Sequence, residues 1–362
     1  MNLIVFSDLH IANKYVDDKV LDSLVNNIKS LAKPDSIICF CGDLMHKRVD
    51  LNDIYARQAI ALCKEIDKLN IPTIFIGGTF SHDYNYIETF KKIELTNFKF
   101  IQTLTELEIK NNIGECINTL IIPEEYVEDQ QEYYKSTVYN KKKIYDLVLM
   151  HGTFTDVLFH NISMESESLR KAPKFESKDF SRHTLTLSGH IHRHQILGKK
   201  KNVIYVGSYT NMNFGNDVSN NIHSIELDVE NKSFNLNTIY NNETHLFEDI
   251  IINEDNINDF ESIILPKIKN KLDRQHFRVN FKYDDNLTLS ILKDLKKEGF
   301  IKSLVYENNI NKSIDEINKN IDDEIDYKEL YHGPLNNQIK TFIKETYNKD
   351  ISIESIDRLL TP

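Results

Sequence analysis

Residues 72–83 read PTIFIGGTFSHD, an apolar run followed by two glycines and then by a histidine and a carboxylate. A short run of isoleucine and phenylalanine is typical of a buried strand, and the paired glycines predict a tight turn after it. The turn would place Ser81, His82 and Asp83 just beyond the carboxyl end of that strand. These residues predict a functional edge of a sheet, and the rest of the chain can be placed around it.

Two earlier apolar runs end in polar residues in the same way. Residues 3–6 precede Asp8 and His10, and residues 36–40 precede Asp43. Because Asp8 and His10 are two positions apart, an extended backbone would turn both side chains to the same side. We therefore expect three strands to direct polar groups toward one place.

The segments between these runs have the spacing of amphipathic helices. Residues 17–31 and 53–69 repeat apolar side chains at helical intervals. Strand and helix thus alternate, which predicts an α/β sheet with its site at the carboxyl ends of the strands.

Later strands supply more imidazoles. An apolar run at 145–150 precedes His151, and another at 184–188 precedes His190 and His192. Further apolar runs of strand length lie between and after these two. Together they predict two packed sheets with helices outside.

The organisation of the chain changes near residue 244. Residues 1–243 carry the whole candidate site, whereas residues 244–307 read as a small α+β unit without a candidate catalytic cluster. Residues 308–326 are rich in asparagine and acidic side chains, which predicts a linker. Residues 327–362 have apolar side chains at helical spacing, so we expect a helical tail that docks on a partner. The alternatives are packing on its own chain and a homodimer contact.

The composition of the chain narrows the range of functions and locations that it could have. A formal net charge of −11 over 362 residues argues against a uniformly basic surface that coats nucleic acid. The first residues lack the pattern of a signal peptide, and no apolar run is long enough to cross a bilayer, so we expect a cytoplasmic protein without a membrane partner. The four cysteines have no CxxC spacing and lie on apolar segments, which predicts buried thiols rather than zinc ligands or disulfides.

Imidazoles and carboxylates together suit divalent metals such as manganese, iron or zinc. Here such groups follow the apolar runs, at Asp8, His10, Asp43, His151, His190 and His192. One carboxylate can bridge two ions, and two ions can hold the attacking and leaving oxygens of a phosphoryl displacement. Any one of these residues alone could be a solvated turn residue. Their common place after strands favours a metal centre that acts on a phosphoester.

Five motifs stand in the order found in the calcineurin-like metallophosphoesterases. They are Asp8-Leu9-His10, Gly42-Asp43, Ser81-His82-Asp83, His151-Gly152 and Gly189-His190-Ile191-His192. The chain resembles this family over about its first two thirds, which implies a four-layer α/β/β/α sandwich. Within the family, the segments SDLHI, GDLMH and GHIHRHQ resemble SbcD-type nuclease subunits of DNA repair complexes, including their bacteriophage versions.

The resemblance implies a role for each ligand. One metal would be held by Asp8, His10 and His192, a second by His151 and His190, and Asp43 would bridge both. The expected metal is Mn²⁺, with Mg²⁺, Fe²⁺ and Zn²⁺ as alternatives. Where the family has an asparagine that binds the second metal, this chain has Ser81, a shorter and poorer neutral ligand. That departure leaves open an inactive fold that only binds.

Two histidines are expected to meet the substrate. The resemblance places His82 near the scissile phosphate, where it would protonate or stabilise the leaving oxygen, with Asp83 orienting its ring. His46 resembles a family position that faces the phosphate, with a surface turn histidine as the alternative reading.

Basic residues flank the motif loops and could contact a phosphate backbone. They are Lys47, Arg48, Arg182, Arg193 and Lys199. A lysine run in a hairpin turn is also an ordinary solvated feature, and no aromatic pattern predicts base stacking. We expect binding that is independent of DNA sequence.

The expected function is that of a Mn²⁺-dependent DNA exonuclease and endonuclease, the nuclease subunit of an SbcC/SbcD-like repair and recombination complex. Its partners would be DNA, an SbcC-like coiled-coil ATPase bound by the C-terminal helices, and a second copy in a homodimer. Its place would be the cytosol of a bacterium or of a phage-infected host. The alternatives are a small-substrate phosphodiesterase, a phosphoprotein phosphatase, and an inactive scaffold for the ATPase.

Overall fold

The computed structural model describes residues 1–50, 52–123, 136, 138, 142–157, 175–214 and 220–306, without the side chains of residues 84–88. Within these ranges, no helix has the length and apolarity needed to cross a bilayer. The predicted linker and helical tail lie outside the described residues.

A first six-stranded sheet has the strand order β12-β11-β1-β2-β3-β4. Its strands are β1 (Asn2–Phe6), β2 (Ser36–Phe40), β3 (Thr73–Ile76), β4 (Phe98–Ile101), β11 (Asn221–Asp228) and β12 (Ser233–Tyr240). Strands β1 to β4 run parallel, whereas β11 runs antiparallel to both β1 and β12. The parallel strands therefore end at one edge of the sheet.

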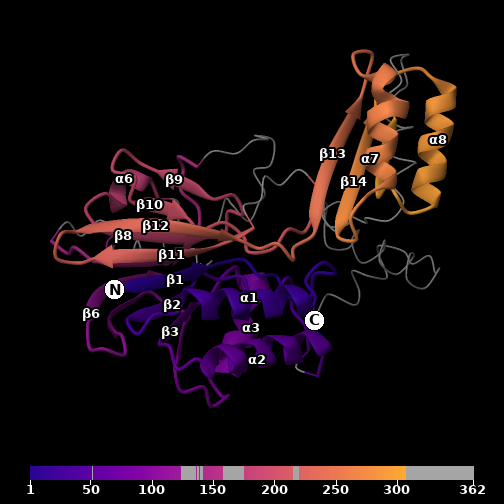
Figure 1. Ribbon diagram of the computed structural model, residues 1–362. Coiled ribbons are helices and arrows are strands. Elements are labelled where there is room, and N and C mark those ends of the chain that lie inside the picture. Colours follow the sequence, from indigo (N-terminus) through magenta and orange to yellow (C-terminus); the bar gives the residue numbers. More distant parts are fainter. Residues whose placement is uncertain are drawn as a thin grey trace, which may run out of the picture. The chain divides into compact units, whose positions relative to one another are not determined.

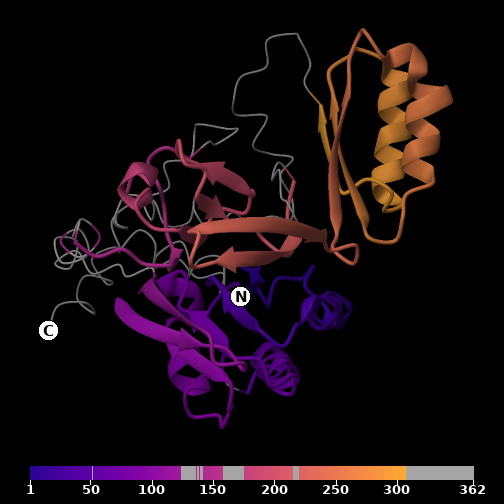
Figure 2. The ribbon, with the colours of Figure 1, turned by 60° about the vertical axis from the view of Figure 1, so that its left-hand side comes forward.

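Three helices lie on one side of this sheet, as Figures 1 and 2 show. They are α1 (Asp18–Leu31), α2 (Ile54–Asp67) and α3 (Phe80–Phe90). Asp17 caps α1 by accepting the N–H of Val20, and Asp53 caps α2 in the same way. The apolar faces of α1 and α2 share one buried cluster with Phe6 and Phe40 of the sheet. The helical spacing read from the sequence thus marks the side that faces the strands.

A second six-stranded sheet has the order β5-β6-β7-β8-β10-β9. Its strands are β5 (Thr105–Lys110), β6 (Cys116–Ile122), β7 (Leu147–His151), β8 (Leu185–Gly189), β9 (Gln195–Leu197) and β10 (Val203–Tyr205). Strands β6, β7, β8 and β10 run parallel. The short helix α6 (Ser177–Phe180) lies before β8.

The two sheets pack face to face through alternate residues of their strands. Val5 and Cys39 of the first sheet share a buried cluster with Leu149 and Leu187 of the second. A third cluster, which includes Phe180 of α6, covers the outer face of the second sheet. The layers are helix, sheet, sheet and helix, which confirms the predicted α/β sandwich.

The cysteines agree with their expected role except at one position. All four are free, and Cys39, Cys41 and Cys63 are buried. Cys116 is exposed, because it begins β6 at the end of a hairpin where the side chains alternate between core and solvent. The prediction of a buried thiol is therefore wrong for Cys116.

The segment after residue 244 forms a three-stranded sheet in the order β13-β14-β15. Its elements are β13 (Leu246–Ile252), α7 (Leu265–Lys269), β14 (Gln275–Phe281), α8 (Asn286–Lys297) and β15 (Ser303–Tyr306). Both helices lie on one face of this sheet (Figures 1 and 2). This confirms the α+β reading of the segment.

One helix of this segment differs from expectation. The sequence predicts a helix over 257–272, but a 3₁₀ turn at Ile257–Asp259 and a π-helical turn at Phe260–Ile264 precede the short α7. Pro266 lies in the first turn of α7, where its missing N–H is tolerated, whereas farther inside a helix it would interrupt the hydrogen bonds.

Residues 1–281 and 285–305 belong to one compact unit. The division predicted at residue 244 stays a prediction. The sequence also missed α3 and β9, which lie at or after motif loops, and the edge strand β12.

The close contact between the sheets near the site can be tested at Gly189. A Cβ at this position would lie 2.1 Å from the carbonyl oxygen of Cys41 and 2.2 Å from Ser7 Oγ. We expect Gly189→Ala to lower the free energy of unfolding by about 1–3 kcal/mol or more, because backbone must move to make room. Urea unfolding of the full chain measures this.

Gly152→Ala is the matched control, because among the described residues a Cβ there meets only Met150 Cε, at 3.4 Å. Equal stability of the two variants would show that the sheets do not approach as described.

Candidate metal centre

The predicted ligands lie in loops that hold unusual backbone conformations. Asp8, His10, Asp43 and His190 have φ angles of 54°, 52°, 58° and 81°. Side chains other than glycine rarely adopt this left-handed region, and each such residue costs on the order of 1 kcal/mol or more. Four strained positions among the six predicted imidazole and carboxylate ligands are typical of a functional site.

Hydrogen bonds between the loops after β1 and β2 hold this geometry. The Asp8 N–H donates to the carbonyl of Gly42 at 2.9 Å, and the His10 N–H donates to the carbonyl of Asp43 at 3.1 Å. The N–H of His190 reaches the Asp8 carboxylate at 3.2 Å from the end of β8. The site is thereby assembled from both sheets.

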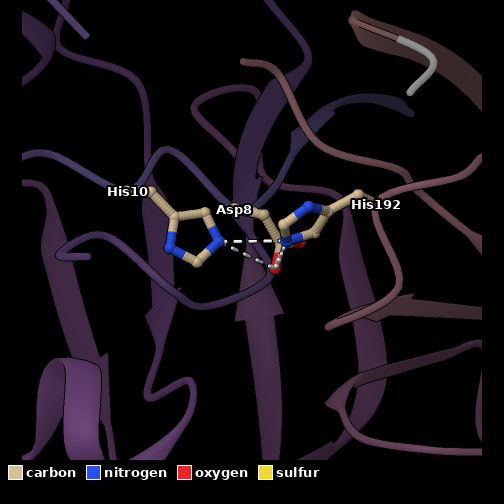
Figure 3. A group of neighbouring side chains, drawn as sticks. All are labelled: Asp8, His10 and His192. Carbon is tan, nitrogen blue, oxygen red and sulfur yellow. Dashed lines mark hydrogen bonds and ion pairs between the residues drawn. The ribbon is translucent and has the colours of Figure 1, made fainter. Parts of the chain in front are cut away.

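A first group of ligands consists of Asp8, His10 and His192 (Figure 3). The two Nε2 atoms of the histidines are 3.0 Å apart, and they lie 3.9 and 3.8 Å from Asp8 Oδ1. The rings approach the carboxylate from two sides in Figure 3. The three side chains therefore surround one point, as the ligands of a single ion would.

The protonation states of His10 and His192 favour the binding of a cation. Burial lowers the pKa of His10 well below its usual value and lowers that of His192 to about 4. Both rings are therefore neutral near pH 7 and each keeps a lone pair. Two imidazole nitrogens and a carboxylate form a donor set that a divalent metal would satisfy. The residues fit the metal that their pattern predicts.

A second group consists of Asp43, His151 and His190. Asp43 Oδ1 lies 3.4 Å from His151 Nε2, while Asp43 Oδ2 lies 3.9 Å from His10 Nε2 in the first group. Each oxygen of this carboxylate therefore faces a different group. This is the arrangement expected of a bridging ligand.

The two carboxylates differ in their proton affinity. Burial acts to raise the pKa of Asp43, but the charges and hydrogen bonds of His151 and His82 outweigh it and lower that pKa well below its usual value. For Asp8, burial prevails and raises the pKa to about 7. Asp43 is therefore a permanent anion, whereas Asp8 needs a nearby cation to stay ionised at neutral pH.

His82 and His46 both lie beside the ligands. His82 Nδ1 is 3.0 Å from Asp43 Oδ2, and its side chain keeps 24% exposure. The ring of His46 lies 5.4 Å from that of His10 and 6.1 Å from that of His82. Burial lowers the pKa of His46. Burial also acts to lower the pKa of His82, but the charge and hydrogen bond of Asp43 together with the charge of Asp83 outweigh it and raise that pKa.

Asp83 does not orient His82 as expected. Its carboxylate accepts the backbone N–H groups of Asp43, Leu44, Met45 and Gly78 at 2.9 to 3.3 Å. It thus ties the loop after β2 to the loop after β3, while the ring of His82 is oriented by Asp43. The family resemblance predicted that Asp83 orients His82, but in the fold the ring contacts Asp43.

Ser81 is not brought to the second group. It lies exposed in the first turn of α3, and no described contact joins it to the ligands. Thr79 lies there instead, with its Oγ1 3.1 Å from Asp43 Oδ2. Sequence reasoning missed Thr79, because it also missed the helix α3 that Thr79 precedes.

The basic residues divide into two sets. The exposed Lys47 follows His46, Arg48 stacks over Phe80 at the start of α3 at 5.4 Å, and the half-buried Arg193 follows His192. These three lie in the loops that carry the site.

The other two basic residues lie at the opposite edge of the second sheet. Arg182 precedes β8 and donates to the carbonyls of Asp179, Lys143 and Val138. Lys199 lies before β10, which runs parallel to β8 and begins beside Thr186. Because the ligands follow the carboxyl end of β8, the structure does not bring Arg182 and Lys199 to them.

Comparisons with known proteins agree with this geometry. The model of the calcineurin-like phosphoesterase family matches residues 1–194. A comparison with curated proteins gives no match.

Solved structures also match this chain, and two of them illustrate the degree of similarity. A protein of unknown function from Aquifex aeolicus is 14% identical, with a TM-score of 0.27, over 49% of this chain and 89% of its own. A 5'-nucleotidase precursor from Thermus thermophilus is 12% identical, with a TM-score of 0.36, over 66% of this chain. The chain spans about half of the precursor, 54% of its length.

The raised pKa of Asp8 predicts a pH-dependent effect of metal. Its pKa in the fold, about 7, exceeds the ordinary 3.8, so its contribution to stability is present below about pH 4 and is lost as the pH rises through about 7. A cation offsets that loss. We expect Mn²⁺ to raise the melting temperature more at about pH 8 than at about pH 6.

Asp8→Asn removes the titrating group. This variant should melt higher than wild type without metal at about pH 8, and Mn²⁺ should raise its melting temperature less at either pH. A rise with Mn²⁺ that is equal at both pH values in wild type would contradict the assignment.

Proposed function

Because the chain belongs to the calcineurin-like phosphoesterase family, we propose that it is a metal-dependent phosphodiesterase that cleaves DNA. The observation that carries this proposal is the Asp43 carboxylate, whose two oxygens face two separate groups of ligands. Such a pair of sites suits the in-line displacement of a phosphoester.

The residues that would hold the cations are Asp8, His10 and His192 in one group and His151 and His190 in the other, with Asp43 shared. When bound, divalent cations supply Lewis acidity and offset the charge that develops at the phosphoryl group. The neutral imidazoles of His10 and His192 are ready to bind without first losing a proton.

His82 is suited to handle the proton of the leaving group. Its raised pKa keeps a larger protonated fraction near neutral pH, and its partial exposure lets it meet a substrate. We expect it to donate a proton to the departing sugar oxygen, a role that commonly contributes about 10²–10⁴-fold in rate. Asp43 holds the ring by its Nδ1, which leaves Nε2 for the substrate.

DNA is the proposed substrate for three reasons. The motifs resemble those of SbcD-type nucleases, the exposed Lys47 and Arg48 lie beside the site, and residues 246–306 add an α+β unit that a small-molecule hydrolase does not need. Mn²⁺ is the expected metal. Binding would be local and independent of sequence, because the chain as a whole carries a net charge of −11.

The proposal extends to partners. The protein would act as the nuclease subunit of a repair and recombination complex, as a homodimer, with residues 327–362 bound to an SbcC-like ATPase. Those residues lie outside the described part of the chain, so this part of the proposal rests on the sequence pattern alone.

His82→Ala is expected to lower the rate of DNA cleavage by about 10²-fold or more while Mn²⁺ binding is retained. Digestion of end-labelled duplex DNA at saturating Mn²⁺ measures the rate, and calorimetry measures the binding. Ser81→Ala is the neighbouring control and should cut like wild type. If His82→Ala cuts as fast as wild type, the role of His82 as a proton donor is wrong.

The same assay discriminates between substrates. Comparable or faster turnover of a generic small phosphodiester than of linear duplex DNA, with or without the ATPase partner, would refute the DNA assignment.

The position of the basic residues leads to a binding experiment. Replacing both Lys47 and Arg48 with alanine should weaken DNA binding and reduce the slope of log affinity against log salt by about two, one for each lost phosphate contact. Lys199→Ala, at the far edge of the sheet, should change neither quantity. Fluorescence anisotropy over a salt series measures both, and equal effects at the two places would argue against a DNA path over the site.

A further inference from the structure

Thr79, which no motif singled out, lies between two residues of the second ligand group. Its backbone N–H donates to Asp43 Oδ1 at 2.6 Å, and its hydroxyl donates to Asp43 Oδ2 at 3.1 Å. The same hydroxyl oxygen is 3.4 Å from His151 Nε2. Thr79 therefore contacts both of these residues with one side chain.

The hydrogen bond of one ring nitrogen of His151 shows which nitrogen faces Thr79. A carbonyl only accepts, so His151 Nδ1 donates its hydrogen to the carbonyl of Cys41 at 2.7 Å, and Nε2 is the nitrogen that faces Asp43 and Thr79. The Thr79 hydroxyl donates to Asp43 Oδ2, and its oxygen lies beside that nitrogen. A cation held by Asp43 and His151 would therefore lie close to a hydroxyl oxygen, an atom type that binds divalent ions.

The start of α3 explains why Thr79 faces the site and Ser81 does not. The carbonyl of Thr79 accepts the N–H groups of His82 and Asp83 at 2.8 and 3.0 Å, so Thr79 precedes the first helical turn. Residues three apart in such a turn lie on one side, which places Thr79 with His82. Ser81 is rotated by about 100° from His82 and is exposed.

The loop before the helix is pressed against Asp43. A Cβ on Gly78 would lie 2.1 Å from Asp43 N and 2.3 Å from Asp43 Oδ1, so only glycine allows this approach. Asp83 holds the loop from the other side by accepting the Gly78 N–H at 3.0 Å. Thr79 is therefore fixed at the ligand group before any ion arrives.

We infer that the Thr79 hydroxyl is the neutral oxygen ligand of the cation that Asp43, His151 and His190 would hold. A hydroxyl oxygen suits a hard or borderline divalent ion such as Mn²⁺ or Mg²⁺. Thr79 then does what the sequence pattern suggested for Ser81. The inference rests on the proposed function, because it requires a cation at the second group.

The test measures metal binding by the full chain and does not depend on activity. Titration calorimetry with Mn²⁺ compares wild type with Thr79→Val, which keeps the shape and loses the hydroxyl, and with Thr79→Ser, which keeps the hydroxyl. Ser81→Ala is the matched control. The melting curve of each variant without metal shows that it is folded, and Thr79→Ala replaces Thr79→Val if the latter does not fold.

We expect wild type to bind two ions. Thr79→Val should weaken the second ion by about tenfold or more and leave the first unchanged, whereas Thr79→Ser and Ser81→Ala should bind both ions as wild type does. If Thr79→Ser loses as much affinity for the second ion as Thr79→Val does, the methyl group and not the hydroxyl matters. That result would overturn the inference. Unchanged binding in Thr79→Val, or weakened binding in Ser81→Ala, would also overturn it.

The outcomes also separate this inference from the proposed function. If wild type binds no second ion, neither the inference about Thr79 nor the proposed function stands. Wild type that binds two ions, with the expected loss in Thr79→Val but no cleavage of DNA, supports the role of Thr79 and contradicts the nuclease.

Discussion

The burial of the Asp43 carboxylate is the constraint on which the site depends. A buried anion is costly unless it is paired and hydrogen-bonded, and Asp43 is 3% exposed. His82 lies 3.0 Å from one oxygen and His151 3.4 Å from the other. Because each oxygen has different neighbours, one carboxylate connects groups that come from both sheets. The two ligand groups therefore share the one buried negative charge of Asp43.

Backbone geometry supports this arrangement. The loops after the parallel strands hold Asp8, His10 and Asp43 in left-handed conformations, and hydrogen bonds between neighbouring loops keep them there. The Asp83 carboxylate contributes by binding N–H groups of two loops at once. A loop that is free to relax would release this strain. The sandwich is therefore a rigid frame whose packing maintains a site that the local sequence alone would not adopt.

The pKa values of the histidines at the site are shifted in different directions by their surroundings. Burial keeps His10 and His192 neutral, so they can bind a metal without competition from protons. The charge of Asp43 has the opposite effect on the partly exposed His82, whose pKa it raises. Histidines a few ångströms apart therefore differ in proton affinity, which suits some of them to bind a metal and another to donate a proton. This contrast is consistent with a metal-dependent phosphoester hydrolase.

The sequence alone was enough to predict the sandwich fold and several residues of the site. Apolar runs and helical spacing predicted most of the strands and helices in order, although not α3, β9 or β12. Polar residues after the strands identified Asp8, Asp43 and His151 as candidate ligands, because parallel strands end at one edge of a sheet. The same patterns could not show which neighbours in a motif share a function. Only the tertiary structure decided that Thr79 and not Ser81 meets Asp43, and that Asp83 binds loop N–H groups, because both depend on where α3 begins. The register of β10 on β8 likewise decided that Lys199 lies far from the ligands. Spacing along a chain reports local conformation, whereas the direction of a side chain in a loop depends on contacts with residues that are remote in sequence.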